Sequence, residues 1–314
     1  MPYQIVTNTP LSDEIMTMLG AECQVQLWSP TGTDPTILRA AEGFFVYGHP
    51  KINGEIMDTM PNLRVISNFG VGVDHIHLED ARARNIPVGN TPNLVDGATA
   101  DMTFALLMAA ARNLIIGDRF ARGPEFTKYD PNILHGYDVF GSTLGIIGMG
   151  NIGKEVAKRA RGFDMKVLYH NRRRNLEAEA ALGATYATLP DLLQQADFVT
   201  LNVPLTPETR GIIGRKQLRM MKPTAVLVNV ARGGVIDHDA LLEALQEKWI
   251  YCAAVDVTEP EPLPRDHPLL KLENFVIAPH LGSATRQTRR RMAQRAVDNL
   301  KAGLRGEPLL NRVA

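Results

Sequence analysis

The stretch that decides the fold is Thr143-Leu-Gly-Ile-Ile-Gly148-Met-Gly150-Asn-Ile-Gly153-Lys-Glu-Val-Ala-Lys-Arg-Ala160. A short apolar run is followed by Gly-x-Gly-x-x-Gly and then by a helix with Ile152, Val156 and Ala160 on one side. The first glycine allows a sharp turn, the second lets the backbone approach a pyrophosphate, and the third lets helix and strand pack closely. Unpaired amides at the helix N-terminus favour an anion. The stretch therefore predicts a dinucleotide-binding turn, with a ligand-free tight turn as the alternative.

The strand that follows indicates which dinucleotide is bound. It ends in His170-Asn-Arg-Arg-Arg174, and no acidic residue stands between Asp164 and Glu177. A carboxylate at this place bonds the ribose 2′-hydroxyl of NAD, whereas guanidinium groups can grip a 2′-phosphate. We therefore expect NADP(H) to be preferred and NAD(H) to be possible, with Arg172 and Arg173 as contacts. The alternative is that these arginines form a solvated face.

Composition narrows the class of protein. The chain has 314 residues, enough for about two domains, and its 34 Lys and Arg balance 34 Asp and Glu. No net charge draws it to nucleic acid or to an anionic membrane. Two cysteines, Cys23 and Cys252, are too few for a disulfide framework, and the start of the chain does not resemble a signal peptide. We expect a soluble cytoplasmic protein whose partners are small molecules, with no nucleic acid, membrane or metal.

The first ninety residues alternate short β-type runs with helix-type segments. One of these segments is 12–19, where Ser12 can cap a helix. Such alternation predicts a parallel sheet wrapped by helices. No glycine turn of the dinucleotide type occurs here. The expected strands are 4–7, 25–28, 43–47, 64–68 and 87–89.

A long apolar helix is expected next, over about 99–118. Phe104, Leu107 and Ile115 recur there at helical spacing, and we interpret the segment as a buried helix that links two domains. Residues 124–141 then read as an irregular loop, which could cover a cleft.

From residue 141 the β-α alternation resumes and runs to a closing helix. That amphipathic helix, over 285–304, has Met292, Ala296, Leu300 and Leu304 on one stripe. The expected strands are 143–148, 165–169, 184–186, 197–202, 224–229, 252–256 and 274–278.

Three residues that follow predicted strands are candidates for chemistry, because ligands of open α/β sheets bind outside the carboxyl ends of the strands. Arg232 could grip a substrate carboxylate and polarise the adjacent carbonyl. Hydride transfer to a ketone needs a proton donor for the alkoxide that develops, and His280 could be that donor. Glu261 could hold the imidazole ring of His280 and favour its charged form. The alternatives are a structural ion pair for Arg232 and a turn role for Glu261 between prolines. Spacing alone does not prove that the three meet.

Six motifs together make the chain resemble the D-isomer-specific 2-hydroxyacid dehydrogenases along nearly its whole length. The resemblance implies two Rossmann-like, doubly wound parallel-sheet α/β domains with a cleft between them, and a homodimer. The substrate domain, flavodoxin-like, would comprise 1–97 and 287–314, and the dinucleotide domain 98–286. The motifs are Asn68-Phe-Gly-Val-Gly-Val-Asp74, Gly148-Met-Gly-Asn-Ile-Gly153, Leu201-Asn-Val-Pro-Leu-Thr-Pro-Glu-Thr209, Val228-Asn-Val-Ala-Arg-Gly-Gly234, Asp256-Val-Thr-Glu-Pro-Glu-Pro-Leu263 and Pro279-His-Leu-Gly-Ser-Ala284.

The family's functional positions can be matched one by one to residues of this sequence, and the resemblance implies a role for each of them. His280 corresponds to the acid/base, Glu261 to its partner and Arg232 to the substrate-binding cation. Val71 and Gly72 correspond to backbone donors for the substrate carboxylate. The expected cofactor contacts are Thr99, Gly148, Gly150, Asn151, Ile152, Gly153, Asn171, Arg172, Arg173, Val203, Pro204, Thr209, Val230, Ala231, Asp256 (at the nicotinamide amide), His280 and Gly282.

Within this family the chain is most similar to glyoxylate/hydroxypyruvate reductases, through 260–270 and 299–308. This branch implies NADPH-dependent reduction of a small 2-oxo acid to the D-2-hydroxy acid. Two alternatives stay open: the same fold acting on 2-ketogluconate, pyruvate or a phenylpyruvate, and a dinucleotide-sensing, corepressor-like binding protein. Relatives commonly have tryptophan around Phe126 and Tyr129, so the loop there leaves the substrate size open.

Overall fold

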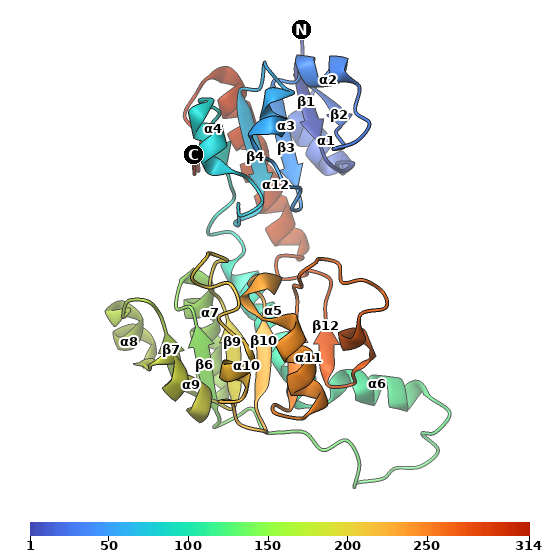
Figure 1. Ribbon diagram of the computed structural model, residues 1–314, viewed down its shortest axis with the longest axis vertical. Helices are drawn as coiled ribbons and strands as arrows, with labels where there is room; N and C mark the ends of the chain where they lie inside the picture. Colours follow the sequence, from blue (N-terminus) through green and yellow to red (C-terminus); the bar gives the residue numbers. More distant parts are fainter. The chain divides into compact units, whose positions relative to one another are not determined.

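The computed structural model describes all residues, 1–314, and divides them into two compact units. One unit comprises Met1–Val95 and Thr285–Ala314, and the other comprises Asp96–Ala284. Each unit is built around one wholly parallel sheet with helices on its faces (Figure 1). The α/β fold class expected from the alternating pattern is confirmed.

The first unit has a five-stranded sheet in the order β2-β1-β3-β4-β5, which is the flavodoxin-like order. Its strands lie close to the predicted bounds, and Ser12 caps the first helix by accepting from the Ile15 amide, as predicted. The strands are β1 (Tyr3–Thr7), β2 (Cys23–Leu27), β3 (Gly43–Tyr47), β4 (Val65–Phe69) and β5 (Val88–Gly89). The helices are α1 (Asp13–Leu19), α2 (Pro35–Ala40), α3 (Gly54–Asp58), α4 (Leu78–Ala83) and α12 (Arg286–Arg305).

The last helix of the chain, α12, completes the first unit by packing on β3 and β4. The predicted apolar stripe of Met292, Ala296, Leu300 and Leu304 is fully buried. Gly303 lets the helix approach the sheet, because a Cβ there would lie 2.4 Å from a methyl carbon of Val65. A segment from the far end of the sequence therefore covers one face of the first sheet.

The second unit has a seven-stranded sheet in the order β12-β11-β10-β9-β6-β7-β8. The first six strands along the chain stand in the order 3-2-1-4-5-6 of dinucleotide-binding folds, with β12 added at the edge. The strands are β6 (Thr143–Ile147), β7 (Lys166–His170), β8 (Thr185–Tyr186), β9 (Phe198–Leu201), β10 (Val226–Asn229), β11 (Cys252–Val255) and β12 (Phe275–Ile277).

Helices cover both faces of this second sheet (Figure 1). Neighbouring strand residues point to opposite faces, so Ile146 packs on the side of α5 and α7 while Ile147 packs on the side of α9 and α11. This burial on both faces explains why the strands are almost wholly apolar. The α-helices are α5 (Asp96–Ala111), α6 (Leu114–Arg122), α7 (Asn151–Ala160), α8 (Leu176–Leu182), α9 (Leu189–Gln195), α10 (Arg215–Leu218) and α11 (His238–Gln246). Short 3-10 helices are η1 (Arg161–Phe163), η2 (Gly233–Val235) and η3 (Pro268–Lys271).

The prediction of one helix over 99–118 is wrong in one respect. The helix ends at Ala111, and α6 begins at Leu114 after a bend of 61°. Asn113 makes the break: its backbone is left-handed (φ +51°), and its side chain donates to the carbonyls of Leu134 and His135. Ile115 consequently lies exposed instead of continuing the buried stripe. The irregular loop predicted for 124–141 is present, with no helix or strand.

The structure contains no single helix long and apolar enough to cross a membrane. Only α5 and α6 taken together, despite their bend, have the required length and composition.

Candidate active site

The glycine turn lies at the point where the strand order of the second sheet reverses. The chain leaves β6 at Gly148, and the neighbours of β6 are β9 on one side and β7 on the other. Connections run in opposite directions from such a point, which leaves a crevice at the carboxyl ends of the strands. The predicted dinucleotide turn therefore stands where open α/β sheets bind ligands.

Each of the three glycines has a distinct environment. Gly148 has φ +104°, and a Cβ there would lie 2.6 Å from the carbonyl carbon of Asn202. A Cβ on Gly153 would lie 2.1 Å from the Gly148 oxygen, so only glycine allows α7 to pack this closely. A Cβ on Gly150 would meet nothing within 4 Å. Gly148 and Gly153 thus serve the protein's own packing, whereas Gly150 leaves an open surface for a ligand.

Donors for an anion are present beside that open surface. The α7 helix begins at Asn151 after Gly150, which offers no side-chain cap, so the first-turn amides of Ile152 and Gly153 have no acceptor in the helix. The side-chain nitrogen of Asn202, in the segment packed against Gly148, is buried without a hydrogen-bond partner. Buried donors are normally satisfied, so these groups fit the phosphates of a dinucleotide.

The segment after β7 is fastened to the glycine turn. Asn171 accepts a hydrogen bond from the Met149 amide (2.7 Å), and Asn175 donates to the Met149 carbonyl (3.1 Å). Asn171, an expected cofactor contact, therefore also holds the turn in place with the same side chain.

The three arginines of this segment differ in their partners. Arg174 pairs with Glu179, which also accepts from the Tyr169 hydroxyl, and together these partners lower the pKa of Glu179 to about 2. Arg172 and Arg173 are exposed and make no ion pair, although the charge of Arg172 contributes to the lowered pKa of Glu208. The two guanidinium groups predicted to grip a 2′-phosphate are thus the two that remain available.

His280 and Glu261 meet, which the spacing in the sequence alone does not prove. Nδ1 of His280 lies 2.6 Å from Oε1 of Glu261, and each side chain keeps about a third of its surface exposed (31% and 33%). The ring is therefore held by a carboxylate while part of it stays accessible. His280 itself has a left-handed backbone with φ +57°, a conformation rare for residues other than glycine and frequent at functional sites.

Asp256 holds the His280 segment in that conformation. Its carboxylate accepts from the amides of Leu281 (2.6 Å) and Gly282 (2.7 Å), and its carbonyl accepts from the His280 amide (2.9 Å). Burial raises the pKa of Asp256, although the two amide bonds oppose this effect. The residue expected at the nicotinamide amide therefore also anchors the segment that carries the imidazole.

Arg232 follows β10, the strand beside β11. Buried Asn229 shapes its segment, because this side chain donates to the Arg232 carbonyl (2.9 Å) and accepts from the Ala231 amide (3.0 Å). A Cβ on Gly233 would lie 2.0 Å from the Thr258 carbonyl carbon. The Arg232 segment thus packs directly against the loop that leads to Glu261.

The remaining expected cofactor contacts belong to the same unit. Thr99, on α5, is buried beside Gly282, and the Thr209 hydroxyl donates to the Pro204 carbonyl at 2.6 Å. Asn229 and Asn175 are not among the site residues expected from the sequence. Asn229 could have been expected from its place at the end of a predicted strand, whereas no sequence pattern marks Asn175. The other residues of this group are Val203, Val230 and Ala231, which follow β9 and β10.

Val71 and Gly72 belong to the first unit, in the turn after β4. Their carbonyls accept from the side chains of Asn90 (2.8 Å) and Asn68 (2.9 Å), respectively. Neither amide has a partner in the structure. The pair accordingly offers two backbone donors, the groups that the resemblance assigns to the substrate carboxylate.

The fold and this edge of the second sheet define a nicotinamide-dinucleotide-dependent α/β enzyme. Residues 104–282 match the family model for the NAD binding domain of D-isomer specific 2-hydroxyacid dehydrogenases, and the chain belongs to that family. It is therefore an NAD(P)-dependent oxidoreductase that reduces a 2-oxo acid.

Individual relatives support this placement. The chain is 50% identical to a glyoxylate reductase from Korarchaeum cryptofilum over 82% of this chain and 77% of the relative. A crystal structure of a Thermus thermophilus protein matches with a TM-score of 0.91 and 42% identity, covering 99% of both chains. An NADPH-dependent glyoxylate/hydroxypyruvate reductase from Sinorhizobium meliloti, in complex with NADP and malonate, matches with a TM-score of 0.89 and 30% identity over 100% of this chain and 97% of that one.

Proposed function

We propose that the protein is an NADPH-dependent reductase of glyoxylate or hydroxypyruvate that forms the D-2-hydroxy acid, with His280 as the proton donor. The observation that carries this proposal is the 2.6 Å contact between His280 and Glu261 at the carboxyl edge of the sheet that bears the glycine turn. An imidazole backed by a carboxylate can supply a proton near neutral pH.

Each proposed role follows from the environment of the residue. A bound nicotinamide supplies the hydride for the carbonyl carbon. His280 gives its proton to the developing alkoxide, and Glu261 stabilises the charged ring and fixes its orientation. Arg232 binds the substrate carboxylate and polarises the carbonyl beside it. The free amides of Val71 and Gly72 are further proposed donors to that carboxylate.

The preference for NADPH rests on Arg172 and Arg173. They follow β7, no acidic residue stands between Asp164 and Glu177, and neither arginine makes an ion pair. Arg174 cannot take the same role without giving up Glu179. The relative from Sinorhizobium meliloti, whose name states NADPH dependence, supports the same choice.

We also propose a homodimer. Apolar side chains stay exposed on α6 and the irregular loop after it, a segment that projects from the second sheet (Figure 1). Exposed fractions reach 81% at Tyr129 and 67% at Phe140. Exposed apolar side chains gathered on one segment are typical of a protein interface. Sedimentation analysis tests this, and a monomer at micromolar concentration would refute it.

The function is tested by assaying a panel of 2-oxo acids with NADPH and with NADH. We expect glyoxylate and hydroxypyruvate to have the highest kcat/KM, and NADPH to be the better cofactor. Faster reduction of 2-ketogluconate, pyruvate or phenylpyruvate would refute the proposed substrate. Tight cofactor binding without turnover of any oxo acid would refute the proposed reaction.

A further inference from the structure

The loop that carries Glu261 makes no backbone hydrogen bond to another segment between Asp256 and Glu261. Beyond β11, the Asp256 amide donates to the Asn229 carbonyl (2.8 Å) and the Asp256 carbonyl accepts from the His280 amide (2.9 Å), and these are the last backbone bonds before Glu261 that join the loop to other segments. Thr258 makes a side-chain bond only to Pro260, within the loop. Close packing of Gly233 on Thr258 and the burial of Val257 and Leu263 support the loop on either side, and side-chain contacts help to hold Glu261 where it meets His280.

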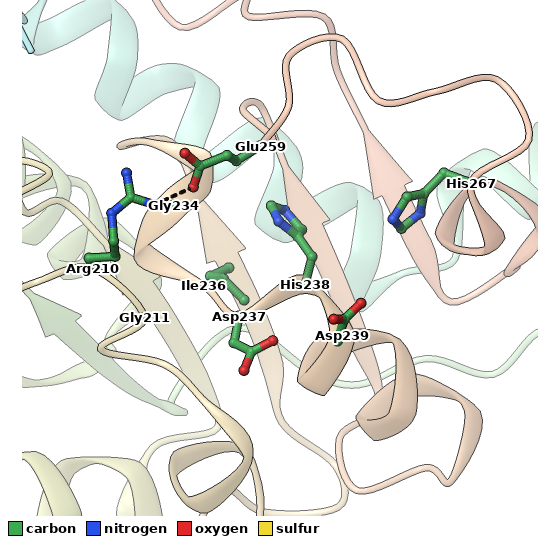
Figure 2. A pocket seen from close by; sticks show the side chains of 9 residues that line it. All are labelled: Arg210, Gly211, Gly234, Ile236, Asp237, His238, Asp239, Glu259 and His267. Carbon is green, nitrogen blue, oxygen red and sulfur yellow. Dashed lines mark hydrogen bonds and ion pairs between the residues drawn. The ribbon is translucent and has the colours of Figure 1, made fainter. Parts of the chain in front are cut away.

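One ion pair supplies such a contact. Nη1 of Arg210 lies 2.7 Å from Oε2 of Glu259, two residues before Glu261 (Figure 2). Between Asp256 and Glu261, Glu259 is the residue whose side chain pairs with a charged group of another segment. The pair also raises the pKa of Arg210, because the carboxylate favours the charged guanidinium.

Arg210 is itself well fixed. Its amide donates to the Thr206 carbonyl (2.9 Å), and the next amide, of Gly211, donates to the Gly234 carbonyl (2.9 Å). A Cβ on Gly234 would lie 2.3 Å from Oε2 of Glu259 and 3.0 Å from Nη1 of Arg210. The backbone that follows Arg232 consequently passes directly beside the ion pair (Figure 2).

The ion pair thus joins the loops that follow β9 and β11 and lies beside the loop that follows β10, the strand between them. Its side chains are 56% and 47% exposed, so solvent screens the pair and it adds little to stability. Its effect on geometry is more important, because a shift of about 1 Å in a catalytic group can lower the rate roughly 100-fold.

We infer that Arg210 is a positioning residue for the reaction: through Glu259 it holds the loop on which Glu261 supports His280. This inference rests on the proposed function. It assigns a role to two residues that lie outside the catalytic trio and outside the cofactor contacts.

The test uses the full-length protein and the variants Arg210→Gln, Glu259→Gln and their combination. We expect each single change to lower kcat for glyoxylate about 5- to 20-fold, with KM for NADPH and the melting temperature nearly unchanged. The combined variant should be no slower than either single one, because both changes remove the same interaction. Arg210→Lys should recover part of the rate.

Arg215→Gln is the matched control. It breaks another ion pair of the same unit, between Arg215 and Glu243 on α11. The Arg215 side chain is 58% exposed and the Glu243 side chain 32%. We expect it to leave kcat unchanged. A loss of kcat in Arg215→Gln equal to that in Arg210→Gln would overturn the inference, because the effect would then belong to any lost ion pair.

A second background separates this inference from the proposed function. In a protein that already carries Glu261→Gln, adding Arg210→Gln should lower kcat no further, since the effect of Arg210 passes through Glu261. The inference would be overturned, while the proposed function stands, by either of two results. One is that Arg210→Gln lowers kcat as much in the Glu261→Gln background as in the wild type. The other is that Arg210→Gln alone keeps the wild-type kcat. A wild-type protein that reduces no 2-oxo acid, or one unaffected by Glu261→Gln, would instead overturn the proposed function.

Discussion

Nδ1 of His280 lies 2.6 Å from Oε1 of Glu261, although 19 positions separate the two residues in the sequence. They follow neighbouring parallel strands, Glu261 after β11 and His280 after β12. Parallel strands bring the residues that follow them to one edge of the sheet. The strand order therefore brings the two segments to one edge of the sheet, and the packing of the loop after β11 decides that their side chains meet.

His280→Asn should lower kcat for glyoxylate about 10²- to 10⁴-fold, because the proton donor is lost. Asparagine suits this test, since it tolerates the left-handed backbone found at His280 (φ +57°) better than alanine does. The dissociation constant for NADPH, measured by fluorescence titration, should change less than about twofold. An equal loss of NADPH affinity would argue against the assigned role.

Replacing both Arg172 and Arg173 with serine should raise KM for NADPH about 10- to 100-fold, as expected for lost charge-assisted hydrogen bonds. KM for NADH should stay within about twofold, because NADH has no 2′-phosphate. Arg161→Ser, at another exposed arginine of the same unit, should alter neither value. If the double variant used NADPH as well as the wild type does, the two arginines would be a solvated surface only.

The glycines of the turn should separate folding from binding. Gly153→Ala should lower the free energy of unfolding by about 1–3 kcal/mol, because its Cβ would lie 2.1 Å from the Gly148 oxygen. Gly150→Ala should change that free energy by less than about 0.5 kcal/mol, since nothing lies within 4 Å of its Cβ. Gly150→Ala should still weaken NADPH binding, because the methyl group occupies the open surface. Chemical denaturation and cofactor titration of both variants give the comparison.

His238 should make stability depend on pH. This residue begins α11, its Nε2 is buried without a partner, and burial is the main cause that lowers its pKa below the ordinary 6.5 (Figure 2). Below pH 6.5 the unfolded chain therefore binds a proton that the folded chain resists, so the free energy of unfolding falls as the pH drops. His238→Phe removes the titrating group and should flatten this fall between about pH 7 and 5.

The control for this pH effect is His135→Gln, which changes an exposed histidine of the loop after α6. Its melting temperature should follow the wild-type pH profile. A steep acid fall that persists in His238→Phe would assign the pH dependence to other groups.

Much of the fold could be predicted because its signals are local. Apolar runs such as 143–147 are buried on both faces, so their composition alone marks them as strands. The break at Asn113 could not be predicted, since it depends on carbonyls of Leu134 and His135 and on the Tyr251 hydroxyl, which donates to the Asn113 side chain from 138 positions away. Apolar residues keep helical spacing on both sides of Asn113, so the sequence predicts one continuous helix there.

By itself the sequence determined the two α/β sheets, the glycine turn and the strand-end places of Arg232, Glu261 and His280, because each depends on short runs of residues and on the geometry of parallel strands. Only the tertiary structure decided how those places are held. Asp256 reaches the Leu281 and Gly282 amides, and Arg210 reaches Glu259 across 49 positions. Such pairs form between loops whose separation is set by the packed sheet, so no local sequence pattern predicts them.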